Sequence, residues 1–133
     1  MNLTKKHHYG LAAMIELGWF YEKGPIHLRF IAEQARIPHA FLEQLILDLK
    51  KSGLVKSTRG AKGGYQLNLS PHGVSINQIF SAIDPLGFEI DEDHPLSFFW
   101  TDFNQHVYDF LSLSLQTLME DSKQRAKVLT YTI

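Results

Sequence analysis

The chain has 133 residues, of which 44% are hydrophobic and 20% are charged, and its formal net charge is −1. This length predicts one compact domain, or one domain with an added element. No apolar run is long enough to span a membrane. There is no cysteine, which excludes disulfides and thiolate-bound metal centres and favours a cytoplasmic location.

The charge is distributed unevenly along the chain. Residues 1–66 contain 10 Lys and Arg against 5 Asp and Glu, a balance of +5. Residues 67–133 contain 3 Lys and Arg against 9 Asp and Glu, a balance of −6. The split predicts a basic half that meets a polyanion and an acidic half with another role. Chance clustering of charges on solvated faces is the alternative, because charge informs about partners and not about fold.

The first element is predicted to be a helix over residues 3–23. Thr4 is its candidate N-cap, and the Gly24-Pro25 pair ends it. Residues 28–35 predict a short second helix. Residues 26–28 are either a short strand or the lead-in to that helix.

A third helix is predicted to begin near Pro38, a residue that suits the first turn of a helix, and to end at Gly53. Its apolar residues follow the i, i+3, i+4, i+7 spacing of a buried stripe. They are Leu42, Leu45, Ile46 and Leu49. The segments "LVKS" and "YQLNL" then predict two strands. Their connection contains Gly60, Gly63 and Gly64, and glycine tolerates positive φ in a tight turn.

The rest of the chain is predicted to be helical, apart from one loop. Ser75 can cap a short helix that runs through Ile83. An acidic, proline-bounded loop, "DPLGFEIDEDHP", follows it. A long helix is predicted over residues 96–113, and Ser114 is the candidate cap of a final short helix through Ser122. The last eleven residues, "KQRAKVLTYTI", are either a tail or an added strand.

The order helix, short helix, turn, helix, two-stranded hairpin, helix is typical of a winged helix-turn-helix. We therefore predict a mainly α fold with a small β-hairpin. Residues 1–83 form the winged helix-turn-helix domain, and residues 84–133 form the acidic loop, a long dimerisation helix and a C-terminal segment. In such a fold one helix reads base edges in the major groove, and Arg59 and Lys62 at the hairpin tip reach a phosphate or the minor groove. A surface hairpin with solvated charges is the alternative interpretation.

Three stretches support a more specific identification: "MNLTKKHHYGLAAMIEL", "IAEQARIPHAFLEQLILDLKKSGLVKSTRGAKGGYQL" and "SINQIFSAID". Together they resemble the IscR/NsrR/CymR-type regulators, a family of dimeric winged-helix transcription factors. The resemblance covers residues 1–120. It implies a sequence-specific DNA-binding transcription regulator, a homodimeric repressor that binds a palindromic operator in double-stranded DNA.

The resemblance and the basic residues of the first half together give a set of candidate site residues. Those expected to contact DNA are His39, Ala40, Phe41, Glu43, Gln44, Lys51, Arg59, Gly60, Lys62, Gly63, Lys5, Lys6 and Arg29. The long helix is implied to pair with its twin. The apolar stripe expected at that interface is Phe99, Trp100, Phe103, Val107, Phe110 and Leu111.

Glu43 is expected to take part in base readout. A carboxylate in the major groove can accept a hydrogen bond from the N4 amino group of cytosine, and the neighbouring Gln44 can pair with adenine. A solvated Glu43 that makes an i, i+4 contact is the alternative. Leu47 stands at that position, however, and supplies no cation.

The chain departs from the family pattern in two respects. Some members hold an iron–sulfur cluster on three cysteines in the loop before the long helix. Here that loop reads "PLGFEIDEDHPLS", so we expect neither a cysteine-ligated cluster nor any other cofactor. Relatives also carry Gly at the position of Arg36 and Ser or Thr near His27. These changes predict an unusual turn in the helix-turn-helix and a weak cap on its first helix.

Three alternatives to a simple DNA-binding regulator are a metal- or pH-sensing site, an enzyme and a protein–protein module. His7, His8, His94 and His106, with Asp91 and Asp93, could form a metal site across a dimer, or His94 could respond to pH. No two of these residues have a recognised ligand spacing, so ordinary histidines are favoured. There is no nucleophile elbow or phosphate-binding loop, and no enzyme is predicted. A winged-helix module for protein–protein contact remains an alternative.

Overall fold

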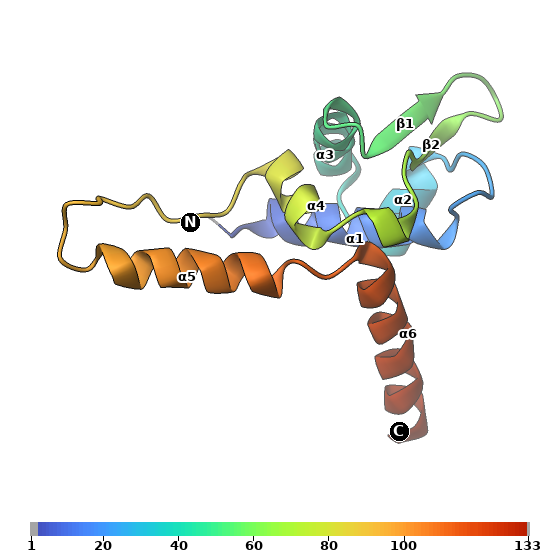
Figure 1. The fold of residues 1–133 in the computed structure, drawn as a ribbon. Coiled ribbons are helices and arrows are strands. Elements are labelled where there is room, and N and C mark those ends of the chain that lie inside the picture. The colour runs from blue at the N-terminus through green and yellow to red at the C-terminus, as the bar shows by residue number, and fades with distance from the viewer. Residues whose placement is uncertain (1–2, 133) are drawn as a thin grey trace.

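The computed structural model describes residues 3–132, which contain six α-helices and one two-stranded antiparallel sheet (Figure 1). In chain order the elements are α1 Lys5–Trp19, α2 Leu28–Ala35, α3 His39–Lys51, β1 Val55–Thr58, β2 Gly64–Leu67, the 3-10 helix η1 Pro71–Gly73, α4 Ile76–Ile83, α5 Ser97–Phe110 and α6 Leu115–Thr132. The predicted mainly α fold with a β-hairpin is confirmed. None of the helices between residues 3 and 132 combines the length and apolarity needed to cross a bilayer.

Reciprocal side-chain caps fix where α1 and α4 begin. The Thr4 hydroxyl accepts the N–H of Lys6 at 3.3 Å, and His7 Nδ1 accepts the N–H of Thr4 at 3.1 Å. At α4, the Ser75 hydroxyl accepts the N–H of Gln78 at 3.2 Å, and Gln78 Oε1 accepts the N–H of Ser75 at 2.8 Å. A cap of this kind contributes about 1 kcal/mol. The predicted starts at Thr4 and Ser75 are confirmed.

The hairpin is extended by one residue from the segment before α2. Within the hairpin, Val55 lies opposite Leu67. Ile26 and Tyr65 exchange two backbone hydrogen bonds, each 2.8 Å long, in a single antiparallel bridge. A Cβ at Gly64 would collide with the carbonyl oxygen of Ile26, so this close approach requires glycine. The short strand considered before α2 is therefore an isolated bridge.

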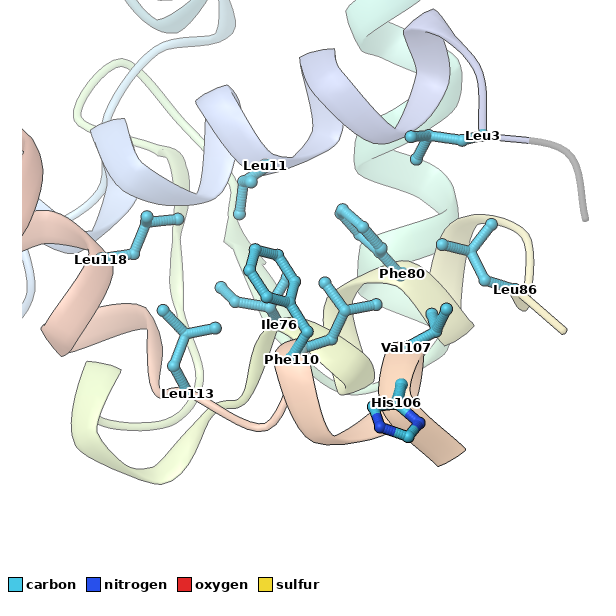
Figure 2. A pocket seen from close by; sticks show the side chains of 11 residues that line it. Leu3, Leu11, Ile76, Phe80, Leu86, His106, Val107, Phe110, Leu113 and Leu118 are labelled. Carbon is cyan, nitrogen blue, oxygen red and sulfur yellow. The ribbon is translucent and has the colours of Figure 1, made fainter. Parts of the chain in front are cut away.

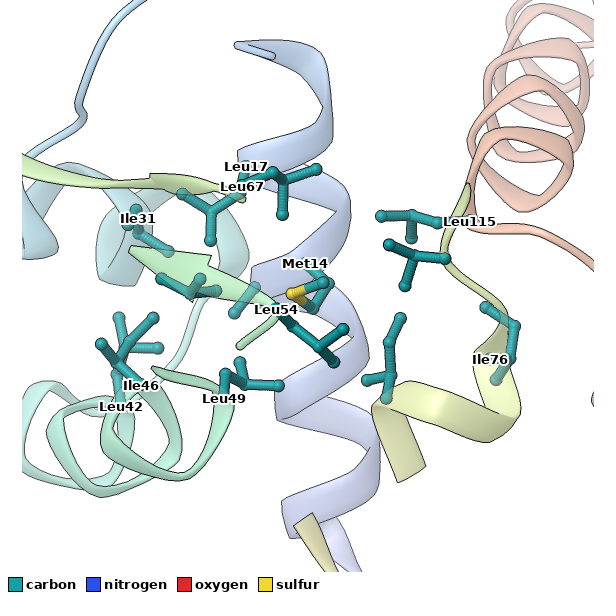
Figure 3. Close-up of a cluster of buried hydrophobic side chains, with 14 of the residues drawn as sticks. Met14, Leu17, Ile31, Leu42, Ile46, Leu49, Leu54, Leu67, Ile76 and Leu115 are labelled. Carbon is teal, nitrogen blue, oxygen red and sulfur yellow. The ribbon is translucent and has the colours of Figure 1, made fainter. Parts of the chain in front are cut away.

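The core collects apolar side chains from α1, α3, the hairpin, α4 and the first turn of α6 (Figure 3). Met14, Ile79 and Leu115 are all 0% exposed. The predicted stripe of the third helix is confirmed, because no member exceeds 1% exposure: Leu42, Leu45, Ile46 and Leu49. Full burial of one such side chain stabilises the fold by about 1.5–3 kcal/mol. The core therefore fixes which side of α3 faces outward.

The turn between α5 and α6 is tied to the segment that leads into α4. The N–H of Leu115 donates to the carbonyl of Val74 at 2.7 Å, and the N–H of Asn77 donates to the carbonyl of Leu111 at 3.0 Å. From this anchored point the two helices leave in different directions (Figure 1). The beginning of α6 packs against α1, and its far end extends away from the rest of the molecule. Leu111 and Leu115 belong to the same buried core as α1. The boundary at residue 83, between a DNA-binding domain and a part for dimerisation, therefore stays a prediction.

Three predicted helix ends are wrong. α1 ends at Trp19, four residues early, and the chain then turns through Glu22 with a φ of 66°. α5 ends at Phe110. α6 continues through Thr132, where a tail or strand was considered after residue 122 and where Ile133 lies outside the described residues. The extension follows from a run of good helix formers, "LQTLMEDSKQRAKVL".

Candidate nucleic-acid interface

A tight turn joins α2 to α3. Arg36 adopts the left-handed conformation with φ 56° and ψ 48°, and the N–H of Ile37 donates to the carbonyl of Ala32 at 3.0 Å. For a residue other than glycine this conformation costs about 1–2 kcal/mol. The helix-turn-helix turn therefore forms despite the arginine. His27, at the N-cap of α2, makes no side-chain hydrogen bond to the helix, which confirms the predicted weak cap.

The outer face of α3 carries most of the residues expected to read DNA. Ala40, Glu43, Gln44 and Lys51 are exposed on the side opposite the buried stripe. Leu47 lies on the same face and is 47% exposed. It was not predicted, although the i, i+3, i+7 spacing from Ala40 would have indicated it. An exposed apolar side chain here can contact a thymine methyl group.

Two residues expected at the DNA are instead engaged in the fold. Phe41 is half-buried and packs edge-on against Tyr9 of α1, with ring centroids 5.2 Å apart. Gly63 is buried, and a Cβ there would collide with the carbonyl oxygen of Thr58. Phe41 therefore joins α3 to α1, and Gly63 closes the hairpin.

The end of α3 and the hairpin present positive charge that has no acidic partner among the described residues. Gly60 has a φ of 102°, and its carbonyl accepts the N–H of Gly63 at 2.9 Å. Residues 49–83 contain five Lys and Arg and no Asp or Glu. The five cations are Lys50, Lys51, Lys56, Arg59 and Lys62, and all of them are exposed. None takes part in an ion pair within residues 3–132, so their charge is available to a polyanion. Lys50 and Lys56 were not predicted to contact DNA, although the absence of Asp and Glu from residues 49–83 would have indicated them.

The other three basic residues expected at the DNA lie on α1 and α2. Lys5 and Lys6 are exposed on the first turn of α1, which lies on the far side of α3 from the hairpin tip (Figure 1). Arg29 is exposed on α2, with its Nε 3.8 Å from Glu33 Oε1. The fold therefore groups α3 with the hairpin and leaves Lys5 and Lys6 at the edge of this surface.

Glu43 has a basic partner that the sequence reasoning missed. The Nδ1 atom of His39 lies 3.2 Å from Glu43 Oε1. The i, i+4 neighbour considered from the sequence was Leu47, four residues after Glu43, and Leu47 supplies no cation. On a helix the residue four positions earlier is an equally close neighbour.

Within one chain, residues 3–132 bring together no three of the residues considered for a metal site across a dimer. His7 is 0% exposed, and its Nε2 lies 2.7 Å from the carbonyl oxygen of Asp84 while its Nδ1 accepts the N–H of Thr4. His94 Nδ1 accepts the N–H of Leu96 at 3.0 Å. Between residues 3 and 132, no three His, Cys, Asp or Glu side chains are placed to hold a metal ion. Of the other four members of the set, His8 is exposed, His106 Nδ1 lies 2.7 Å from the carbonyl oxygen of Asp102, and Asp91 Oδ1 accepts the N–H of Asp93 at 3.1 Å.

These features define a winged helix-turn-helix protein. The sequence pattern of the Rrf2 family, described as "Iron-dependent Transcriptional regulator", matches residues 3–121, and the chain belongs to this family. IscR of Aliivibrio salmonicida is 40% identical over 84 residues, and the match covers 63% of this chain but only half, 50%, of the relative's length. This relative is a transcriptional regulator and not an enzyme.

Two solved structures are similar over nearly their whole length. CymR, the global cysteine regulator of B. subtilis, superposes with a TM-score of 0.81 at 33% identity, covering 90% of this chain and 97% of that one. IscR of T. potens gives a TM-score of 0.81 at 31% identity, covering 94% of this chain and 90% of that one.

The description of the family as iron-dependent raises the question of which residues here could hold iron. Iron–sulfur clusters are ligated mainly by cysteine thiolates, and the chain contains none. The described His, Asp and Glu residues form no group of three that could replace them. The donor set therefore does not fit a cysteine-ligated cluster.

Proposed function

We propose that this chain binds double-stranded DNA as a homodimeric transcription repressor and does so without a cysteine-ligated cluster. One observation carries the proposal: α3 and the hairpin lie on the same side of the molecule (Figure 1). The exposed residues of α3 include Glu43, Gln44 and Lys51, and those of the hairpin include Arg59 and Lys62. With α3 in the major groove, the tip is positioned to reach an adjacent phosphate or the minor groove. CymR of B. subtilis is named as a global cysteine regulator, which agrees with this function.

The salt dependence of binding tests the DNA proposal. Operator fragments selected from random DNA are titrated with the protein at several salt concentrations, and binding is followed by fluorescence anisotropy. Because neutralised phosphates release counterions, the logarithm of affinity should fall linearly with the logarithm of salt concentration, with a slope of about −0.9 per phosphate contact. A winged-helix module that binds only proteins would show no such binding.

The proposed dimer rests on α5. Within residues 3–132, α5 has no buried residue, and Phe99 and Phe110 are 51% and 79% exposed. Beside it lies an apolar groove of about 500 Å³ (Figure 2), lined from α1, α4, α5 and α6 by residues that include Leu11, Phe80 and Phe110. Exposed apolar surface of this extent marks an interaction site. We assign it to a second copy of the chain.

Two residues expected in the dimer stripe have other contacts. Leu111 is 8% exposed and belongs to the core of its own chain. Trp100 is half-buried and stacks on Phe88 of the acidic loop, with ring centroids 4.1 Å apart. The Asn104 side chain also exchanges two hydrogen bonds of 2.9 Å with the backbone of Phe88. The acidic loop is therefore fastened to the proposed dimer helix, where it can report a signal.

Symmetry and position give the remaining parts of the proposal. A two-fold dimer presents two equivalent reading helices, so the operator should be palindromic. A dimer bound across a promoter excludes RNA polymerase, and we therefore propose repression, in the cytoplasm where bacterial DNA lies. Run-off transcription from a promoter that contains the selected operator should decrease as protein is added. Increased transcription would contradict repression.

The cluster-free state has its own test. Protein purified without oxygen should be colourless, because the chain contains no thiolate. It should also bind its operator without added iron. Visible absorbance together with stoichiometric iron would contradict this part of the proposal.

A further inference from the structure

Both acidic side chains on the exposed faces of α2 and α3 have a basic neighbour one helical turn earlier. On α2, Arg29 Nε lies 3.8 Å from Glu33 Oε1. On α3, His39 Nδ1 lies 3.2 Å from Glu43 Oε1. A groove between the two helices is lined by Arg29, Glu33 and His39, with Ala32 and Ile37 at its base. Only the contact on α3 is close to hydrogen-bond length.

The stability of the fold does not account for the pair on α3. Both side chains are exposed, and exposed pairs of this kind contribute little. A pair in which the basic residue precedes the acidic one also stabilises a helix less than a pair in the reverse order. The pair lies on the first two turns of α3, which are the turns proposed to enter the major groove. Its place on this surface is therefore better explained by recognition than by stability.

Glu43 needs a partner in order to read a base. A free carboxylate on an exposed helix samples several rotamers and is repelled by the DNA phosphates. When His39 Nδ1–H donates to Oε1, one carboxylate oxygen is occupied and the other stays free to accept the N4 amino group of cytosine. Donation through Nδ1 leaves His39 Nε2 free of this contact.

We propose that His39 is a positioning residue for base readout, which holds the Glu43 carboxylate toward a cytosine. The proposal rests on the proposed function, because it requires α3 in the major groove. The other charged groups near this end of the groove are Arg29 and Glu33, which contact each other, and Arg36 in the turn.

Affinity for a selected operator and for its single-base variants tests the proposal. It is measured at one salt concentration for the wild type, Glu43→Ala, His39→Ala and the double variant. Glu43→Ala should lose about 5- to 150-fold of discrimination at one base pair. His39→Ala should lose most of the same discrimination at the same base pair. The double variant should lose no more than Glu43→Ala, because the two residues act as one unit.

A further variant separates positioning from a structural effect. His39→Asn keeps an N–H donor near the place of Nδ1, and it should restore most of the base preference that His39→Ala loses. His72→Ala, on the η1 turn that packs on α6, is the matched histidine control and should keep the base preference of the wild type.

The outcomes distinguish this inference from the proposed function. If the wild type shows no salt-dependent DNA binding, the proposed function fails, and this inference fails with it. If the wild type binds and Glu43→Ala changes the base preference while His39→Ala does not, His39 is not a positioning residue. Loss of preference at a different base pair in His39→Ala, or no recovery in a folded His39→Asn variant, would overturn it as well.

Discussion

The region formed by α3 and the hairpin and the region formed by α5 and the acidic loop expose opposite kinds of surface. α3 buries the apolar stripe Leu42, Leu45, Ile46 and Leu49 and presents mainly polar and basic residues to solvent. α5 buries none of its described residues and presents aromatic rings. Its loop adds Glu89, Asp91, Glu92 and Asp93.

The difference shows which partner each surface suits. Exposed cations without acidic partners attract a polyanion, and the attraction weakens with salt. Exposed aromatic rings beside an apolar groove favour a second protein surface, because burial of apolar area is their main source of free energy. One small core therefore supports both proposed interfaces, and we expect that each can be disrupted separately.

The largest expected effect is loss of the dimer in Phe110→Asp. Phe110 is 79% exposed and lines the apolar groove. A charge at the centre of a buried interface should cost about 2–4 kcal/mol of association free energy. Sedimentation velocity at micromolar concentration should show a monomer. Phe98→Asp is the control, since Phe98 is 63% exposed but lies on another side of α5, and it should stay dimeric. A dimeric Phe110→Asp would remove α5 from the proposed interface.

The next effect concerns the basic region alone. Lys62→Ala should weaken binding to all DNA sequences and reduce the log–log salt slope by about 1, because one phosphate contact is lost. Arg59→Ala should weaken binding to the selected operator and also reduce the salt sensitivity. Lys123→Ala, an exposed cation on α6, should change neither quantity. Unchanged slopes in both hairpin variants would mean that the hairpin does not touch DNA, and dimerisation should be unaffected in all three.

A smaller effect is expected from relief of backbone strain in the α2–α3 turn. Arg36→Gly should raise the free energy of unfolding by about 1 kcal/mol, because glycine adopts the left-handed conformation without the cost borne by arginine. Urea denaturation measures the change. Glu22→Gly, at the other non-glycine residue with positive φ among residues 3–132, should give a similar gain outside that turn. A loss of stability in Arg36→Gly would show that the arginine side chain stabilises the turn.

The last prediction concerns α1, which packs against both α3 and α6. Burial raises the pKa of Glu16 above its ordinary value of 4.5. The folded protein therefore holds this proton more tightly than the unfolded chain, and ionisation lowers the free energy of unfolding as pH rises through and above 4.5. Glu16→Gln should be more stable than the wild type at neutral pH. The difference in the free energy of unfolding between Glu16→Gln and the wild type should shrink as the pH falls below 4.5. A difference that persists in acid would point to packing instead.

Much of the fold could be predicted from the sequence because its signals are local. The caps at Thr4 and Ser75 depend on residues within one helical turn, and so does the stripe that begins at Leu42. The glycine-rich basic tip of the hairpin was visible for the same reason. These signals were sufficient to give the winged helix-turn-helix and to select the region for DNA binding.

What the sequence could not decide was which residues from distant elements meet. Phe41 packs on Tyr9, and Gly64 accommodates the backbone of Ile26. Leu111 enters the core of its own chain. Each outcome depends on how separate elements pack, because burial and close backbone approach are properties of the assembled fold and not of a local pattern. The His39 contact to Glu43 is within one helix, yet its geometry depends on side-chain rotamers, which only the tertiary structure specifies.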